Sequence, residues 1–300
     1  MSGSIKNVTL AGATGSLGRI ILDKLVLSNK FNIRVLRRQG SNFTSAAGTD
    51  VVDVDFNSVA SLAAALGDQD AVISVLGSSA ITMQKILIDA SIAAGVKRFV
   101  PSEFGANIDD AKTRAIPWFA EKVKIQDYLL HKSTISPITY TFVYNGAFLD
   151  WGLEHDFILK ISDYRPRIID GGDSIFSTTS LPTIGDAVVG LLLHPEETRN
   201  RSVFIHDIKV SQNQLLALAK QTAPNKPWKP EHVKLDDITA VADVRLAQGL
   251  TDARSLYPYL YRAAMDPTYG NNFPRVDNEL LGLKLKSEED IVQILKRLIK

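Results

Sequence analysis

The chain contains 300 residues, of which 45% are hydrophobic and 22% are charged, a composition typical of a globular protein. Its 34 Lys and Arg residues nearly balance 33 Asp and Glu residues, and the net charge of +1 argues against a broad nucleic-acid-binding surface. The absence of cysteine excludes disulfides, thiolate nucleophiles and cysteine-bound metals. We therefore expect a protein with one or two compact domains and no nucleic-acid partner.

Segments that would send the chain to a membrane or out of the cell are not evident in the sequence. No apolar stretch approaches the roughly 18 residues that a membrane span needs, and the first residues lack a basic segment followed by a long apolar run. We expect a cytoplasmic monomer or homodimer without membrane contact. The five histidines lack metal-ligand spacing, and no Gly-x-Ser-x-Gly motif is present, so we predict neither a metal site nor serine hydrolase chemistry.

Short strand-like runs alternate with segments of helical spacing through the first half of the chain. The strand-like runs are residues 8–10, 33–36, 50–54, 71–76 and 97–100, and the helical segments are residues 17–25, 59–66 and 81–94.

This alternation predicts a parallel sheet covered by helices on both faces, a Rossmann-type doubly wound α/β fold. We assign a dinucleotide-binding domain to residues 1–150. Beyond residue 150 the strands become shorter, and Pro and Gly become denser. Residues 151–300 are therefore expected to form a smaller α+β substrate-binding region, partly interleaved with the first domain.

A glycine-rich loop, Gly12-Ala-Thr-Gly15-Ser-Leu-Gly18, lies between the first strand and the first helix. Glycines let the backbone approach a pyrophosphate, and the helix N-terminus offers free N–H groups and a positive dipole end. The spacing is similar to that of short-chain dehydrogenases. We assign the three glycines to cofactor binding, together with Thr14, Ser16 and Leu17; the alternative is a glycine-rich turn without a ligand.

An arginine pair, Arg37-Arg38, ends the second strand, where NAD-preferring proteins usually carry an acidic residue for the ribose 2′-OH. Guanidinium groups pair well with a phosphate. The pair therefore predicts a preference for NADP(H), and the alternative is a solvated basic turn.

Lys122 is the candidate for proton transfer. Short-chain dehydrogenases usually carry Tyr-x-x-x-Lys, but Trp118 occupies the tyrosine position here. At ~100° per residue, Lys122 falls on one helical arc with Trp118, Ile125 and Leu129. A lysine within an apolar stripe is expected to have a lowered pKa and to exchange protons readily. The alternative is a lysine whose stem packs on the stripe and whose ammonium reaches solvent.

Further segments follow the loop and the arginine pair in a familiar order. They are Ala71-Val-Ile-Ser-Val-Leu-Gly77, Arg98-Phe-Val-Pro-Ser-Glu-Phe-Gly105 and Phe119-Ala-Glu-Lys122. Together these segments resemble the NmrA-like and isoflavone reductase-like family of atypical short-chain dehydrogenases. The resemblance covers most of the chain and is strongest up to about Trp151.

The resemblance implies a Rossmann domain, a smaller substrate domain and a cleft between them. In reductases of this family the lysine matching Lys122 is the proposed acid/base residue and lies near the nicotinamide ribose, whereas the arginine often found four residues later is Gln126 here. The resemblance and the strand ends also suggest cofactor contacts at Leu76, Gly77, Ser78, Phe104 and Asn145 and substrate contacts at Phe104, Phe148 and Trp151. For Asn145 the alternative is a residue that only ends a strand.

We therefore predict an NADPH-dependent reductase of a small aromatic or conjugated metabolite, with hydride from the nicotinamide and Lys122 as acid/base. Two alternatives use the same scaffold. One is an NmrA-type regulatory protein that senses dinucleotides without catalysis. The other is a redox-neutral isomerase or cyclase.

Overall fold

A seven-stranded parallel sheet organises the molecule, whose computed structural model describes residues 4–44 and 48–299. In spatial order its strands are β10 (Arg201–Phe204), β6 (Thr139–Tyr144), β5 (Arg98–Val100), β4 (Ala71–Ser74), β1 (Asn7–Ala11), β2 (Asn32–Arg38) and β3 (Thr49–Val54). Every neighbouring pair is parallel, which confirms the predicted Rossmann-type doubly wound fold. The edge strand β10 comes from the second half of the chain.

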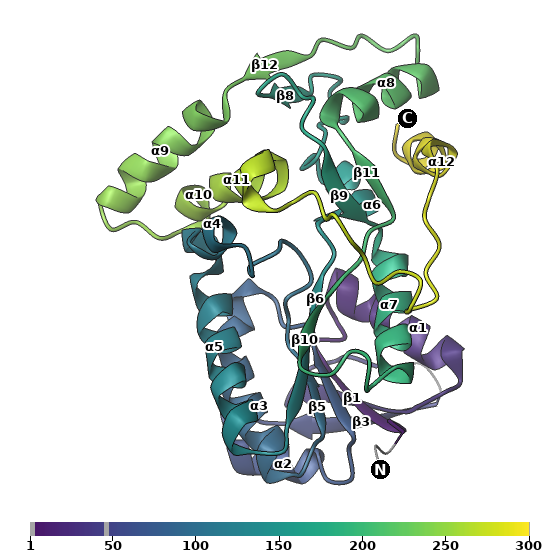
Figure 1. Ribbon diagram of the computed structural model, residues 1–300, viewed down its shortest axis with the longest axis vertical. Helices are drawn as coiled ribbons and strands as arrows, with labels where there is room; N and C mark the ends of the chain where they lie inside the picture. Colours follow the sequence, from purple (N-terminus) through teal and green to yellow (C-terminus); the bar gives the residue numbers. More distant parts are fainter. Residues whose placement is uncertain (1–3, 45–47, 300) are drawn as a thin grey trace.

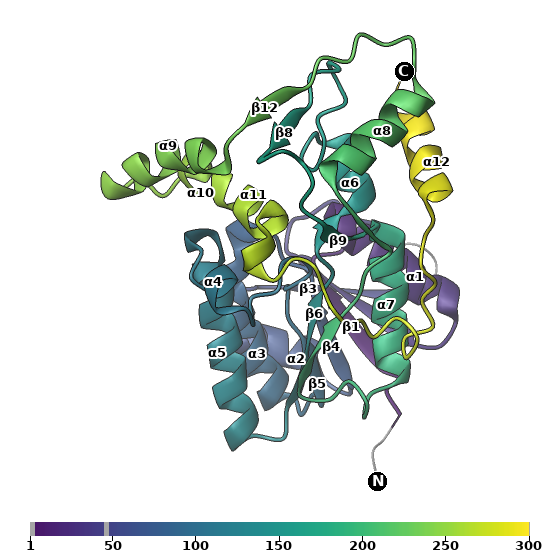
Figure 2. The same cartoon turned by 45° about the horizontal axis from the view of Figure 1, so that its top comes forward.

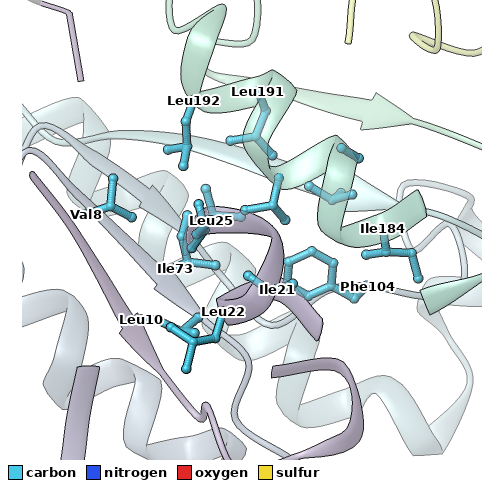
Figure 3. Close-up of a cluster of buried hydrophobic side chains, with 14 of the residues drawn as sticks. Val8, Leu10, Ile21, Leu22, Leu25, Ile73, Phe104, Ile184, Leu191 and Leu192 are labelled. Atoms are coloured by element: carbon cyan, nitrogen blue, oxygen red, sulfur yellow. The ribbon is translucent and has the colours of Figure 1, made fainter. Parts of the chain in front are cut away.

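Helices cover both faces of this sheet (Figure 1). One face carries α1 (Ser16–Ser28) and α7 (Leu181–Leu193), which pack against each other. Figure 3 shows the buried cluster between them, where Ile21 and Leu25 of α1 lie near Leu191 of α7. The other face carries α2 (Val59–Ala65), α3 (Gln84–Ala93) and α5 (Ala120–Ile135), whose apolar sides form a second core with the sheet.

Local sequence signals account for most of these boundaries. Ser58 caps α2 by accepting a hydrogen bond from the Ser61 N–H. The fourth strand is shorter than expected and ends at Ser74, close to the point where its neighbour β5 reaches Pro101, which has no N–H for a strand ladder. The helix expected from residue 81 begins earlier, as the 3₁₀ helix η1 (Ser78–Met83), before α3.

The second half of the chain builds a layer beyond the carboxyl ends of the strands. Its sheets are β11–β9–β7 (Ile208–Val210, Phe176–Thr179, Ala147–Phe148) and β12–β8 (Glu231–Val233, Arg167–Ile169). Its helices are α6 (Leu149–Glu154), α8 (Gln212–Thr222), α9 (Leu235–Ala247), α10 (Ala253–Leu256), α11 (Pro258–Met265) and α12 (Glu288–Leu298).

A separate apolar core holds most of this layer together, while α9 projects outward from it (Figure 2). Short elements connect it to the sheet: α4 (Ala111–Arg114), the 3₁₀ helix η2 (Pro117–Phe119), which leads into α5, and the 3₁₀ helix η3 (Pro267–Tyr269). Among the helices that the structure describes, none is both long and apolar enough to cross a membrane.

A buried cation fastens β5 to the strands and loops beside it. The Arg98 guanidinium, 3% exposed, donates to the hydroxyls of Thr139, Thr141 and Thr198 at 2.9, 2.9 and 3.1 Å and to the Pro195 carbonyl at 2.5 Å. Burial lowers the pKa of Arg98 to about 10. The side chain therefore serves as a structural clamp rather than as a ligand-binding group.

The change Arg98→Met is expected to lower the free energy of unfolding by about 3 kcal/mol, because several buried acceptors lose a charged donor at once. Urea denaturation would measure this loss. The neighbouring change Lys97→Met is the control: Lys97 is exposed, so losing its ion pair with Asp70 should cost no more than about 1 kcal/mol. Equal effects of the two changes would contradict the assigned role of Arg98.

Candidate active site

A hollow opens at the carboxyl ends of β1, β2 and β4, where ligands bind in open α/β sheets. It is lined by Gly12, Ala13, Thr14, Gly15, Val35, Leu36, Arg37, Arg38, Ser41, Phe43, Phe56, Val75, Leu76, Gly77, Ala80 and Met83. The glycine-rich loop, the arginine pair and the end of the fourth strand, which are far apart in sequence, therefore meet in one place. We call this the dinucleotide hollow.

The three positions in the loop are glycine for different physical reasons. Gly12 has φ +98°, and a Cβ there would lie 2.5 Å from the Val75 carbonyl oxygen. A Cβ on Gly18 would lie 2.0 Å from the Gly12 carbonyl oxygen. Gly15 has ordinary backbone angles, and the nearest atom to a Cβ there is 3.7 Å away. Protein packing thus explains two of the glycines, and a ligand that approaches the backbone would explain Gly15.

The N-terminus of α1 faces this hollow without a side-chain cap. Thr14, Gly15 and Ser16 are exposed, and the cap residue Gly15 has no side chain to accept the first helical N–H groups. These groups and the helix dipole are suited to a phosphate. The neighbouring Leu17 is different, because its side chain is buried in the core beneath α1 and does not line the hollow.

The two arginines are not equivalent, contrary to the expectation of a guanidinium pair acting together. Arg37 lies opposite Asp53 in the β2–β3 register and forms a bidentate pair with it at 2.6 and 2.8 Å, while its third nitrogen donates to the Phe43 carbonyl at 2.8 Å. The hydrogen bond from Arg37 lowers the pKa of Asp53. Arg38 is exposed on the rim, and its guanidinium has no hydrogen-bond or ion-pair partner in the part of the chain that the structure describes.

A second cavity, of about 870 Å³ including its open mouth, lies beneath α11. Its lining is mostly apolar and aromatic, and polar groups come from Lys122, Ser177 and Asn271. Phe104, Phe148 and Trp151, expected from the sequence to contact substrate, all belong to this lining. The remaining lining residues are Gly105, Ala106, Trp118, Phe119, Gly146, Ala147, Phe157, Leu260, Ala263, Ala264 and Phe273. We call this the aromatic cavity.

Lys122 reaches the aromatic cavity from the first turn of α5. Phe119, Ile125 and Leu129 on its arc are buried, so the expected apolar stripe is present, and Trp118 lies at the cavity wall in edge contact with Tyr257. The Lys122 ammonium donates to the main-chain carbonyl of Glu103. Burial lowers the pKa of Lys122, and the opposing charge of Glu103 acts in the other direction. The side chain is thus held at the cavity without an ion pair among the described residues.

The segment after β5 connects the two hollows. The Ser102 hydroxyl donates to the Leu76 carbonyl at 2.9 Å, and Leu76 lines the dinucleotide hollow. Two residues later, Phe104 lines the aromatic cavity with φ +23°, a left-handed conformation that costs a non-glycine residue free energy. Bonds to the Gly105 carbonyl from the Asn145 and Gly146 N–H groups hold this segment in place. A ligand extending from one hollow to the other would pass this segment.

Five of the residues assigned to cofactor binding belong to neither lining: Ser16, Leu17, Gly18, Ser78 and Asn145. Asn145 is fully buried at the end of β6, where its Nδ2 donates to the Gly146 carbonyl at 2.9 Å and its own carbonyl accepts from the Thr179 hydroxyl at 2.6 Å. Its Oδ1 is buried and has no hydrogen-bond partner among the described residues, so its assignment to cofactor binding stays a prediction. Ser16 and Ser78 are exposed but line neither hollow.

One ionisable residue of the site had no role assigned from the sequence. Glu103 lies within the Pro-Ser-Glu-Phe-Gly segment, only 2% exposed. A polar residue in a short run after a buried strand was the available signal, but the sequence does not display that this carboxyl is buried. Within the described residues, no group of three or more His, Cys, Asp or Glu side chains could hold a metal ion.

Together these features define a Rossmann-type protein with a dinucleotide hollow and an adjoining aromatic cavity that is lined by a half-buried lysine. The NmrA-like family model matches residues 4–155, slightly more than half of the chain. "Oxidoreductase aprR" of Aspergillus flavus is 32% identical over 299 aligned positions, covering 96% of this chain and 98% of the relative. The chain belongs to the NmrA-like family. The relative's name agrees with the enzyme class expected from the sequence.

Solved structures of plant reductases share the whole architecture. Leucoanthocyanidin reductase of Vitis vinifera in complex with NADPH has a TM-score of 0.79 at 20% identity, covering 96% of this chain and 99% of that chain. The structure described as AtPrR2 with NADP+ and (+)pinoresinol has a TM-score of 0.81 at 18% identity, covering 99% and 100%. At these identities the likeness establishes the fold, including the second layer.

Proposed function

We propose that the protein is an NADPH-dependent reductase that acts on a small aromatic or conjugated molecule. The observation that carries the proposal is the junction of the two hollows: an uncapped helix N-terminus opens into one, a half-buried lysine reaches the other, and the Ser102–Phe104 segment borders both. The NADPH- and NADP+-bound structures of the same fold support this choice of cofactor.

The residues of the dinucleotide hollow fit a phosphorylated dinucleotide. The nearest protein atom to a Cβ on Gly15 would be 3.7 Å away, which leaves room for a ligand. The Gly15 N–H donates to the Gly12 carbonyl at 3.3 Å, and the Thr14 and Ser16 N–H groups beside it are available to a pyrophosphate. Arg38 offers a free guanidinium on the rim for a 2′-phosphate, while Arg37 is held by Asp53, which balances its charge, and forms a fixed part of the wall. When bound, NADPH supplies the hydride.

The aromatic cavity accounts for the remaining parts of the reaction. Its aromatic walls are suited to a flat, apolar substrate and exclude water from the reacting atoms. An oxygen atom gains negative charge when the attached or conjugated carbon accepts a hydride. The Lys122 ammonium can stabilise that charge and donate the proton, and its lowered pKa makes the transfer easier. A carbonyl, an enone or a benzylic ether would meet these requirements.

A panel assay tests the proposal. Purified protein is mixed with NADPH and aromatic ketones, enones and benzylic ethers, and the loss of nicotinamide absorbance is followed. We expect turnover with at least one class and a product that carries deuterium when the cofactor is deuterated at the transferred position. Tight NADPH binding without turnover across the panel would instead favour a dinucleotide sensor, and product without cofactor oxidation would favour an isomerase or cyclase.

The change Arg38→Ala is expected to weaken NADPH binding by about tenfold, because the loss of one charge-assisted hydrogen bond costs ~1.5 kcal/mol. Binding of NADH, which lacks the 2′-phosphate, should be unchanged. Fluorescence titration with both cofactors measures the two values. Arg34→Ala is the matched control. Arg34 lies on the same strand as Arg38 but outside the hollow, and it pairs with Asp50 of the neighbouring strand β3. An equal loss for both cofactors would contradict the role of Arg38.

A further inference from the structure

Glu103 places a buried ionisable group close to the half-buried Lys122. Its carboxyl oxygen Oε2 is buried and has no hydrogen-bond partner among the described residues. The main-chain carbonyl of the same residue accepts the hydrogen bond from Lys122. The two charged ends do not form an ion pair in the part of the chain that the structure describes, and Glu103 does not line the aromatic cavity. A buried, unpaired carboxyl calls for an explanation, because burial of such a group is costly.

The other charged and titratable groups around Glu103 come from three different elements. Asp109, before α4, accepts a hydrogen bond from the Tyr144 hydroxyl of β6 at 2.8 Å. Arg114 of α4 reaches Gln126 of α5 at 2.6 Å, and Gln126 donates to the same hydroxyl at 2.7 Å.

These surroundings act on the Glu103 carboxyl in opposite directions. Burial raises the pKa of Glu103 to about 7, the charge of Lys122 opposes this rise, Asp109 adds to it and Arg114 opposes it. Glu103 is therefore poised to change its charge near neutral pH.

The charge of Glu103 decides how readily Lys122 releases its proton. An ionised carboxyl nearby stabilises the ammonium, and after proton transfer it would leave an uncompensated negative charge in the interior. A neutral carboxyl offers no such stabilisation, and after transfer both groups are uncharged. The proton that Lys122 gives up goes to the substrate oxygen, and Lys122 regains a proton from solvent afterwards. Proton donation is thus easier while Glu103 is neutral.

We propose that Glu103 is a positioning residue that acts through Lys122: its neutral form makes Lys122 a ready proton donor, and its ionised form holds the proton on Lys122. The catalytic consequence rests on the proposed reductase function, whereas the electrostatic coupling between the two side chains does not. Because Glu103 loses its proton as the pH rises, reduction should slow above about pH 7.

The coupling can be tested without turnover. Protein labelled with ¹³C at the lysine Cε is titrated and followed by NMR, and the Lys122 resonance is assigned by its absence in Lys122→Met. We expect an inflection near pH 7 in the Lys122 resonance of the wild type and none in Glu103→Gln, in which the pKa of Lys122 should also be lower. The control Glu121→Gln, an exposed residue paired with Lys124, should titrate like the wild type. Identical curves for the wild type and Glu103→Gln would overturn the proposal.

Activity provides the second measurement. We expect the wild-type kcat to fall by about three- to tenfold between pH 6 and pH 8, as a change of half to one unit in the pKa of the donor implies. Glu103→Gln should retain a flat profile over this range, and Glu121→Gln should keep the wild-type slope. If folded Glu103→Gln kept the wild-type slope of kcat against pH, the inference would be overturned and the proposed reductase function would still stand. Absence of turnover in every variant would overturn the proposed function, and the NMR titration would still decide the coupling.

Discussion

Replacing Lys122 by Met is expected to lower kcat by about 10²–10⁴-fold, the range in which a positioned general acid contributes to catalysis. Methionine keeps most of the apolar stem on the stripe of α5 but removes the group that donates a proton. Because Lys122 lines the aromatic cavity and not the dinucleotide hollow, NADPH binding should change far less than kcat. Steady-state kinetics with a substrate found in the panel, combined with a cofactor titration, would measure both effects.

The same replacement also removes the hydrogen bond to the Glu103 carbonyl, so a structural cause must be separated from a chemical one. Lys122→Arg retains a donor for that carbonyl but is a much weaker acid. We expect it to keep the stability of the wild type and still lose most of the activity. Full activity in folded Lys122→Met would exclude Lys122 as the proton donor.

The glycine-rich loop should respond to alanine in opposite ways at two positions. Gly18→Ala is expected to lower the free energy of unfolding by about 3 kcal/mol, because its Cβ would overlap the Gly12 carbonyl oxygen and the backbone has to move. The Cβ of Gly15→Ala would lie 3.7 Å from its nearest neighbour, an ordinary contact distance, and stability should be unchanged. It should weaken NADPH binding by about tenfold or more, ~1.4 kcal/mol, because the added methyl group occupies the path of the pyrophosphate.

Thermal unfolding and cofactor titration of the two variants separate packing from binding. Each variant serves as the control for the other, since both add one methyl group to the same loop. Normal NADPH affinity in Gly15→Ala would contradict the proposal that the N-terminus of α1 binds the phosphates. Unchanged stability in Gly18→Ala would contradict the close contact between Gly18 and Gly12.

Periodic and local features of the chain could be predicted from the sequence. Buried strands such as β4 are continuous apolar runs, and Ser58 stands where a helix needs a cap, so the order of strands and helices follows from short-range rules. The glycine loop and the stripe of Lys122 are equally local. Each depends on residues within about two helical turns, which the sequence displays directly.

Features that depend on contacts between distant segments could not be predicted in the same way. The partner of Arg37 is set by the β2–β3 register, which pairs it with Asp53 sixteen residues away. Phe104 adopts a left-handed conformation that no glycine or asparagine marks. Asn145 lies at a strand end, as expected, but the second layer buries it. The missing information in each case is the position of another part of the chain.

Strand β10 and helix α7 belong to the second half of the chain but complete the first domain, and this matters for building chimaeras between members of this family. A graft that exchanged everything after residue 155 would also replace the edge strand that pairs with β6 and the helix that covers Ile21 and Leu25 of α1. Foreign residues would then have to match a native sheet and a native helix surface at once. Segments exchanged in order to change substrate preference should therefore exclude residues 181–204. The host protein then supplies its own edge strand and its own helix partner.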